Sequence, residues 1–89
     1  MGDEPASVLL GSVAAGMALV VAPSIGRFRP LVDTGLVASG TVIAVVNGGG
    51  GRADDVRVPV AAEVRGLLAL EGQTVQTGQA LAWVRRLDR

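Results

Sequence analysis

The feature that most constrains this chain is an internal repeat, because the segment Val20 to Val46 recurs with changes as Val56 to Val84. The first parts of the two copies align at an offset of 36 residues and the last parts at 38, so the second copy has two extra residues in its middle turn. Each copy contains short stretches of alternating apolar residues separated by glycine turns, a pattern typical of all-β proteins. Neither copy can bury an apolar face alone, whereas two copies that close on each other can. The sequence therefore predicts an all-β, quasi-twofold flattened β-barrel or sandwich of two repeats.

The length allows one small domain with an N-terminal extension. A domain in a chain of 89 residues buries only about 60 to 65% of its unfolded surface, so contacts with a partner or a second copy would add stability. We assign residues 1–17 to an N-terminal arm and residues 18–89 to the domain. Within the domain we expect repeat one at 18–46, a hairpin at 47–55 and repeat two at 56–85.

The residue types that are missing from the chain exclude most site chemistry. There is no cysteine and no histidine, and all eight basic residues are arginines. Thiolate nucleophiles, cysteine metal sites and a histidine acid or base are therefore excluded, and the acidic residues lack the spacing of a cation site. Eight acidic residues balance the arginines, which leaves no basic field for nucleic acid. We expect no catalytic residue, no metal and no cofactor.

The N-terminal part of the chain is apolar, since Ala6 to Pro23 contains no charged residue. A membrane helix is an alternative for a run of this length. Against it, Asp3 and Glu4 precede the run where a signal segment has basic residues, and glycines and serines dilute its apolarity. We expect a cytoplasmic protein without membrane contact, in which Pro5 to Met17 packs as an arm on the domain or on a neighbour.

Alternation along the expected strands assigns their faces. Arg27 and Arg29 share one side of a strand and Phe28 takes the other, so Phe28 is expected in the core. Val64 has the same place in repeat two, between two charged residues. The charged side chains themselves are expected to be solvated, with binding as the alternative.

Trp83 lies in the last expected strand and is interpreted as a core or interface anchor, with stacking on a ligand as the alternative. Adjacent acids at Asp54 and Asp55 point to opposite sides of an extended chain, so they are expected in a polar turn and not as a proton-sharing pair. The candidate ligand or interface residues are Arg27, Phe28, Arg29, Arg65 and Trp83.

The residues resemble a known family. Ala22-Pro23 with Gly26 three residues on, and above all the stretch Glu71 to Leu81 with its pattern Gly-x-x-Val-x-x-Gly-Gln-x-Leu, are similar to biotinyl/lipoyl carrier domains, including the biotin carboxyl carrier protein. The resemblance covers residues 18–85. It implies a barrel-sandwich hybrid fold in which an exposed turn between the two halves presents an acceptor lysine.

This chain departs from the family at the acceptor position. Counting back from Val56 places the lysine of the family at Gly50 or Gly51, within the run Gly48 to Gly51, and the sequence contains no lysine anywhere. The resemblance therefore implies a domain that carries neither biotin nor lipoyl. We interpret the glycine run as a tight, flexible hairpin, with a backbone-lined anion loop as the weaker alternative.

Three classes of function remain. The first is a non-carrying biotinyl-like domain that acts as a docking or structural subunit of a larger enzyme, through a protein partner. The second is a stand-alone barrel or homo-oligomer whose apolar interior binds a hydrophobic small molecule and promotes a positioning-driven cyclisation or isomerisation. The third is a membrane adaptor of the efflux-pump type, for whose helical hairpin Asn47 to Asp55 leaves no room. We favour the first class, and the sequence leaves enzymatic activity open.

Overall fold

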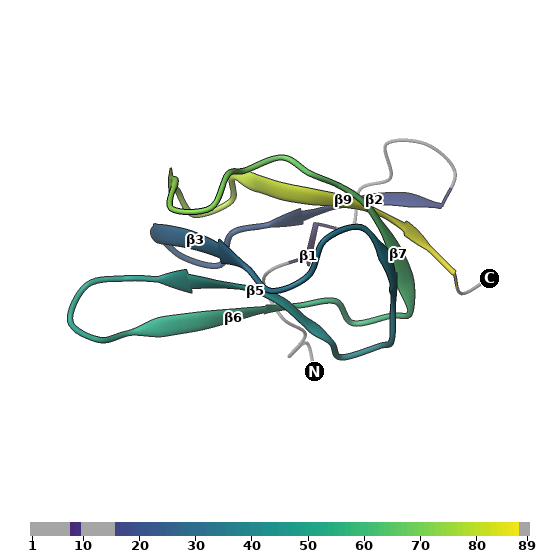
Figure 1. The fold of residues 1–89 in the computed structure, drawn as a ribbon, viewed down its shortest axis with the longest axis horizontal. Coiled ribbons are helices and arrows are strands. Elements are labelled where there is room, and N and C mark those ends of the chain that lie inside the picture. The colour runs from purple at the N-terminus through teal and green to yellow at the C-terminus, as the bar shows by residue number, and fades with distance from the viewer. Residues whose placement is uncertain (1–7, 10–15, 88–89) are drawn as a thin grey trace.

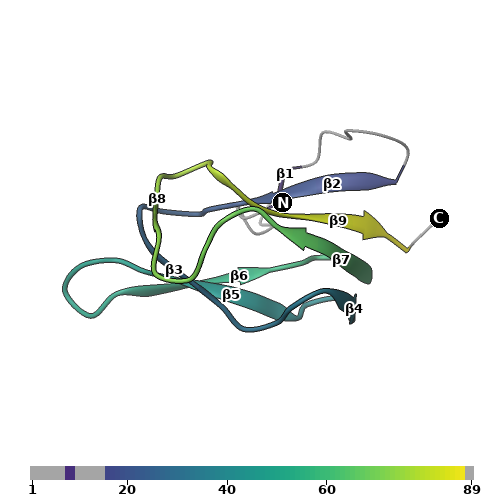
Figure 2. The same cartoon turned by 45° about the horizontal axis from the view of Figure 1, so that its top comes forward.

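The computed structural model describes residues 8–9 and 16–87, which form two antiparallel sheets. Sheet A has the strand order β1-β2-β9-β7-β4 and sheet B the order β6-β5-β3-β8. Figure 2 shows β2 and β9 in one layer and β3, β5 and β6 in the other. The strands are β1 (Val8–Leu9), β2 (Met17–Val21), β3 (Gly26–Pro30), β4 (Gly35–Val37), β5 (Val42–Asn47), β6 (Ala53–Arg57), β7 (Ala62–Leu67), β8 (Thr74–Val75) and β9 (Ala80–Arg86).

The two repeats build the two sheets by exchanging strands (Figure 1). Repeat one supplies β2 to β5 and repeat two supplies β6 to β9. Replacing each strand of the order β2-β9-β7-β4 by its equivalent in the other repeat gives β6-β5-β3-β8, which is the order of sheet B. The prediction of an all-β, quasi-twofold flattened sandwich is therefore confirmed.

The turns repeat as well as the strands. The backbone N–H of Gly78 donates to the carbonyl of Ala22 at 2.8 Å, and that of Gly40 donates to the carbonyl of Val58 at 2.7 Å. These bonds are equivalent at the offsets of the sequence repeat, and both glycines have a positive φ, 84° and 87°. Only glycine adopts this conformation without strain, which explains why each repeat keeps a glycine here.

The core lies between the sheets and is made of the inward residues of both. Phe28 and Val64 are buried, with relative exposures of 1% and 0%, so both are core residues as predicted. Burying such side chains contributes roughly 1.5–3 kcal/mol each. The largest fully buried side chains are Phe28, Leu81, Val20, Val46, Val56, Val58, Val64 and Val75.

The second repeat begins earlier than the sequence predicts. β6 starts at Ala53, so Asp54 and Asp55 belong to a strand and not to a turn. The two acids do point to opposite sides, as alternation requires: Asp54 is half-buried and Asp55 is exposed. β6 is an edge strand of sheet B, where charged side chains discourage pairing with other chains.

Only a small part of the expected N-terminal arm can be compared with the structure. Residues 1–7 and 10–15 lie outside the described residues. Val8 and Leu9 form β1, which pairs antiparallel with β2 and adds a strand to the edge of sheet A. Within the described part of the chain there is no helix with the length and hydropathy to cross a membrane.

Candidate functional site

The β5–β6 hairpin occupies the place where the carrier resemblance expects its modified turn, and Figure 1 shows it projecting from one end of the sandwich. The N–H of Gly48 donates to the carbonyl of Arg52 at 2.8 Å, and the N–H of Arg52 donates to that of Gly49 at 3.4 Å. At the tip, Gly50 and Gly51 have φ values of 72° and 81°. Two successive positive φ values are what a type I′ turn requires, so the glycines serve a tight hairpin as predicted.

The hairpin is fixed to the body of the sandwich at its base. The hydroxyl of Ser24, in the β2–β3 turn, donates to Oδ2 of Asp54 at 2.6 Å, and Nε of Arg52 lies 3.7 Å from the same oxygen. Beneath the hairpin, Gly26 lies so close to Asn47 that a Cβ atom on it would collide with the Asn47 carbonyl. The first residues of the hairpin therefore have a defined direction, and only its glycine tip is free of side-chain contacts.

The contacts at the base of the hairpin were not predicted from the sequence. The hydrogen bond between Ser24 and Asp54 joins residues that are 30 positions apart, and no periodicity connects them. A usable signal was present at Gly26, whose equivalent in repeat two is the buried Ala62. A strand glycine whose equivalent in the other repeat has a side chain indicates that another backbone segment approaches closely at the glycine.

Arg27 and Arg29 lie on the outer face of sheet B, where both are exposed. In register, Arg27 is opposite Asn47 of β5 and Thr74 of β8, while Arg29 is opposite Val45. Neither arginine forms an ion pair with any other described residue. The two candidate cations are thus neighbours on one surface, with their charges uncompensated by the described part of the chain.

Trp83 and Arg65 lie together on the outer face of sheet A. The half-buried indole covers Gly66, where an added Cβ would collide with its Nε1 atom. The Arg65 guanidinium carbon lies 5.9 Å from the ring centroid, and its Nη1 atom lies 3.4 Å from Oε1 of Glu63. Trp83 is therefore not part of the core, which was one of the two expected places, and it remains a candidate interface anchor.

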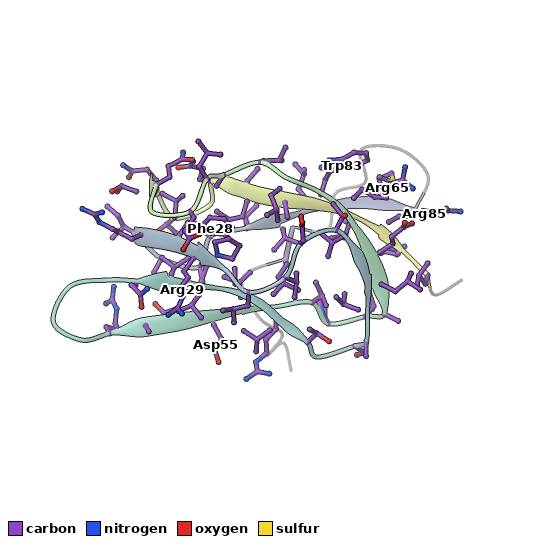
Figure 3. All side chains as sticks on the ribbon, in the orientation of Figure 1. Phe28, Arg29, Asp55, Arg65, Trp83 and Arg85 are labelled. Carbon is purple, nitrogen blue, oxygen red and sulfur yellow. The ribbon has the colours of Figure 1, made fainter. Side chains whose placement is uncertain are left out.

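The structure does not gather the five candidate residues into one site. Figure 3 shows Arg65 and Trp83 on one side of the molecule and Arg29 on the other, with Phe28 between the sheets. Phe28 is 1% exposed, so neither a ligand nor a partner can reach it. Two separate surfaces remain, one around Arg27 and Arg29 and one around Trp83.

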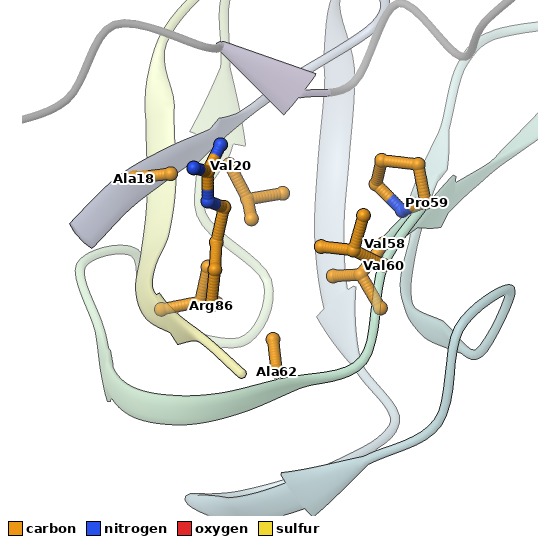
Figure 4. Close-up of a pocket in the computed structure, with 8 residues that line it drawn as sticks. Ala18, Val20, Val58, Pro59, Val60, Ala62 and Arg86 are labelled. Carbon is orange, nitrogen blue, oxygen red and sulfur yellow. The ribbon is translucent and has the colours of Figure 1, made fainter. Parts of the chain in front are cut away.

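A small cavity lies at the edge of the core (Figure 4). Its volume is about 40 Å³. Pockets for small molecules typically enclose about 300–1,000 Å³, so this cavity gives no support to the binding of a hydrophobic molecule. The described residues also contain no group of three or more acidic side chains that could hold a metal ion. The cavity is lined by Ala18, Val20, Val58, Pro59, Val60, Ala62, Val84 and Arg86.

Comparison with known proteins supports the fold. No protein-family model and no curated protein matches the sequence. A solved structure described as a single-chain, multi-domain long-chain acyl-CoA carboxylase matches with a TM-score of 0.76 and 20% sequence identity, over 89% of this chain and 8% of that one. This chain thus corresponds to a small part of the carboxylase. The likeness supports the biotinyl-carrier-like fold that the sequence resemblance implies.

Proposed function

We propose that this chain is a non-carrying biotinyl-like domain that acts as a docking or structural subunit of a larger enzyme assembly. The observation that carries the proposal is the β5–β6 hairpin. It is a tight turn between the two repeats, and the carrier resemblance aligns Gly50 or Gly51 with the acceptor lysine. Glycine has no amine to form the amide bond with biotin or lipoyl, so the carrier reaction has no acceptor in this sequence.

A domain with the carrier fold and no acceptor would act through its surfaces, by which we propose that the assembly holds it. The well-filled core and the fixed hairpin base show that the scaffold is maintained in detail. The fold match is to part of a multi-domain carboxylase, so the kind of assembly we propose is a carboxylase or a related multi-domain enzyme.

The test is native mass spectrometry of the untagged chain, alone and after capture from an extract of its own cells. We expect a complex of defined stoichiometry with one or more subunits of an enzyme, and an unmodified mass for this chain. A control capture uses a chain carrying Phe28→Ala, which removes a core side chain and should lose the partner together with the fold. If the chain is recovered alone or only with copies of itself, the docking role is wrong.

A second experiment tests the carrier geometry of the hairpin by restoring an acceptor. Gly50→Lys or Gly51→Lys, each with methionines at the flanking positions, is incubated with a biotin ligase. There is room for either side chain, since a Cβ at these positions has no atom within 4 Å. A lysine at positive φ costs about 1–3 kcal/mol, which a hairpin tip can tolerate. We expect biotin transfer, and its absence would mean that the turn no longer has the geometry of a carrier.

A further inference from the structure

The two repeats differ in charge at one pair of equivalent positions. In β7, Glu63 and Arg65 form an ion pair with 3.4 Å between Nη1 and Oε1, so their charges compensate each other. Their equivalents in β3, at the offset of 36 residues, are Arg27 and Arg29. Repeat one therefore has a cation where repeat two has the acid. Two like charges stand about 7 Å apart along one face of a strand, an arrangement from which the fold itself gains nothing.

The side chains beside these arginines have unused hydrogen-bonding groups. Thr74 and Asn47 flank Arg27 on the neighbouring strands β8 and β5. Both are exposed, and within the described ranges neither makes a side-chain hydrogen bond. A hydroxyl, a guanidinium and an amide thus lie side by side in one row across sheet B, with the Arg29 guanidinium one pleat further along. All four groups can donate hydrogen bonds to the oxygens of an anion.

Glu71 and Asp55 are described acids near this row: Glu71 is exposed and precedes Gly72, whose N–H donates to the carbonyl of Phe28, and Asp55 is already engaged. Asp55 lies beyond Val45 in the row of Arg29, and its Oδ2 atom lies 3.3 Å from Nη2 of Arg57. Its carboxylate is therefore held at the edge of the sheet by another arginine. The chain is neutral as a whole, so the excess positive charge of this surface is local.

We propose that Arg27, Arg29, Asn47 and Thr74 form a docking surface for an extended, acidic segment of the protein partner, whose carboxylates bind the two guanidinium groups. The proposal rests on the proposed function, because it names the surface and the chemistry of the partner in that assembly. Charge complementarity carries the choice of partner. Guanidinium binds carboxylate in a bidentate manner, and alternate residues of an extended chain have the same spacing of about 7 Å as the two arginines. A nucleic acid would require a larger cationic field than two arginines provide.

The test is an NMR titration of the ¹⁵N-labelled chain, at low ionic strength, with a short peptide that carries glutamate at alternate positions. We expect shift changes confined to the amides of β3 and of residues 47 and 74. Neutralising both cations with Arg27→Gln and Arg29→Gln should weaken binding about ten-fold, since two exposed ion pairs with the peptide are lost. Salt should weaken the binding of the wild-type chain in the same direction.

Matched controls separate this surface from nonspecific attraction. Arg85→Gln removes an exposed arginine on the outer face of sheet A and should leave the affinity unchanged. A peptide with glutamine in place of glutamate should cause no shifts. The proposal is overturned if the double variant binds like the wild type, if Arg85→Gln weakens binding as much, or if a single-stranded oligonucleotide shifts the same amides more strongly than the acidic peptide.

A capture experiment distinguishes failure of this surface from failure of the proposed function. The wild-type chain and the double Arg27→Gln, Arg29→Gln variant are each used to capture the partner from cell extract. Loss of a stoichiometric partner by the folded variant supports the surface, whereas retention by the variant overturns it and leaves the docking function standing. If neither chain captures a partner, the docking function is wrong, and the titration still decides whether the surface binds acidic segments.

Discussion

The inner faces of the two sheets repeat each other closely, whereas their outer faces do not. Equivalent inner positions are apolar and buried in both repeats, as in the pairs Val20 and Val56, Ala22 and Val58, Phe28 and Val64, Ile43 and Leu81, Ala44 and Ala82, and Val46 and Val84. Arg29 and Arg65 are alike, but many other equivalent outer positions differ in chemistry, as in the pairs Leu19 and Asp55, Val21 and Arg57, Arg27 and Glu63, Leu36 and Thr74, Val45 and Trp83, and Asn47 and Arg85.

The difference shows which residues the fold requires and which it leaves free. A side chain between the sheets must be apolar and of a suitable volume, whichever repeat it comes from. A side chain on an outer face has no such requirement, so its identity can reflect contacts with other molecules. One outer face carries Trp83 and several apolar residues, and the other carries two arginines that form no ion pair with any residue the structure describes. Specific function is therefore to be sought on the outer faces.

The largest effect is expected from removing an inner side chain. Phe28→Ala should lower the free energy of unfolding by about 3–5 kcal/mol, because it leaves a cavity between the sheets. Val64, the smaller equivalent residue in repeat two, is the comparison, and Val64→Ala should lower the free energy of unfolding by only about 2 kcal/mol. Urea denaturation of both variants measures the two losses. Equal losses would mean that the core does not depend on Phe28 more than on its twin.

The second largest loss of stability is expected at Gly26, a position at which the two repeats have different residues. Gly26→Ala introduces the side chain that its twin Ala62 already has, and its Cβ would meet the Asn47 carbonyl and lie 2.9 Å from Cγ1 of Val46. The strain should cost about 1–3 kcal/mol, seen as a lower Tm. Gly49→Ala is the control, because a Cβ there has no atom within 4 Å. A harmless Gly26→Ala would show that β3 can move away from the hairpin.

A smaller effect is expected for the acid that lies at the rim between the sheets. Asp54→Ala removes the acceptor of the Ser24 hydroxyl and should cost about 1 kcal/mol in urea denaturation. Its neighbour Asp55 points outward and pairs only with the exposed Arg57, so Asp55→Ala should cost less than about 0.5 kcal/mol. Faster hydrogen exchange of the hairpin amides in Asp54→Ala alone would confirm that this residue fixes the base.

The smallest change in stability is expected when an outer residue is replaced by the equivalent residue of the other repeat. Leu36 is 75% exposed, and Leu36→Thr, which copies Thr74, should change the free energy of unfolding by less than about 0.5 kcal/mol. The adjacent Val37 packs against the core, so Val37→Thr should cost more than about 1 kcal/mol. A large loss for Leu36→Thr would contradict the distinction between inner and outer positions.

The fold could be predicted from the sequence because it depends on features that repeat. The alternation around Phe28 and Val64 specified the buried side, and the glycine turns specified where strands end. Symmetry then required the two copies to close on each other. The hairpin between the repeats was also predictable, since the run Gly48 to Gly51 lies between the end of repeat one and the start of repeat two.

Other features depend on contacts between distant residues, which no local pattern reveals. Asp54 and its neighbour suggested a turn, because two adjacent acids rarely mark a strand unless that strand lies at an edge. Trp83 was expected in the core or at an interface, because its size favours burial, but it covers Gly66 from outside. Ser24 has no partner in its own turn. These residues determine the base of the hairpin and the surface around Trp83, which were therefore less predictable than the fold.

The exchange of strands between repeats has a consequence for biosynthesis. β2 needs β9 beside it in sheet A, and β9 is made after the other eight described strands. A ribosome that has completed repeat one therefore holds an uncharged apolar strand, Met17–Val21, that lacks this neighbour. Such a strand is prone to pair with other nascent chains. Folding must wait until β9 has been synthesised, and a chain truncated before β9 should aggregate instead of forming half a domain.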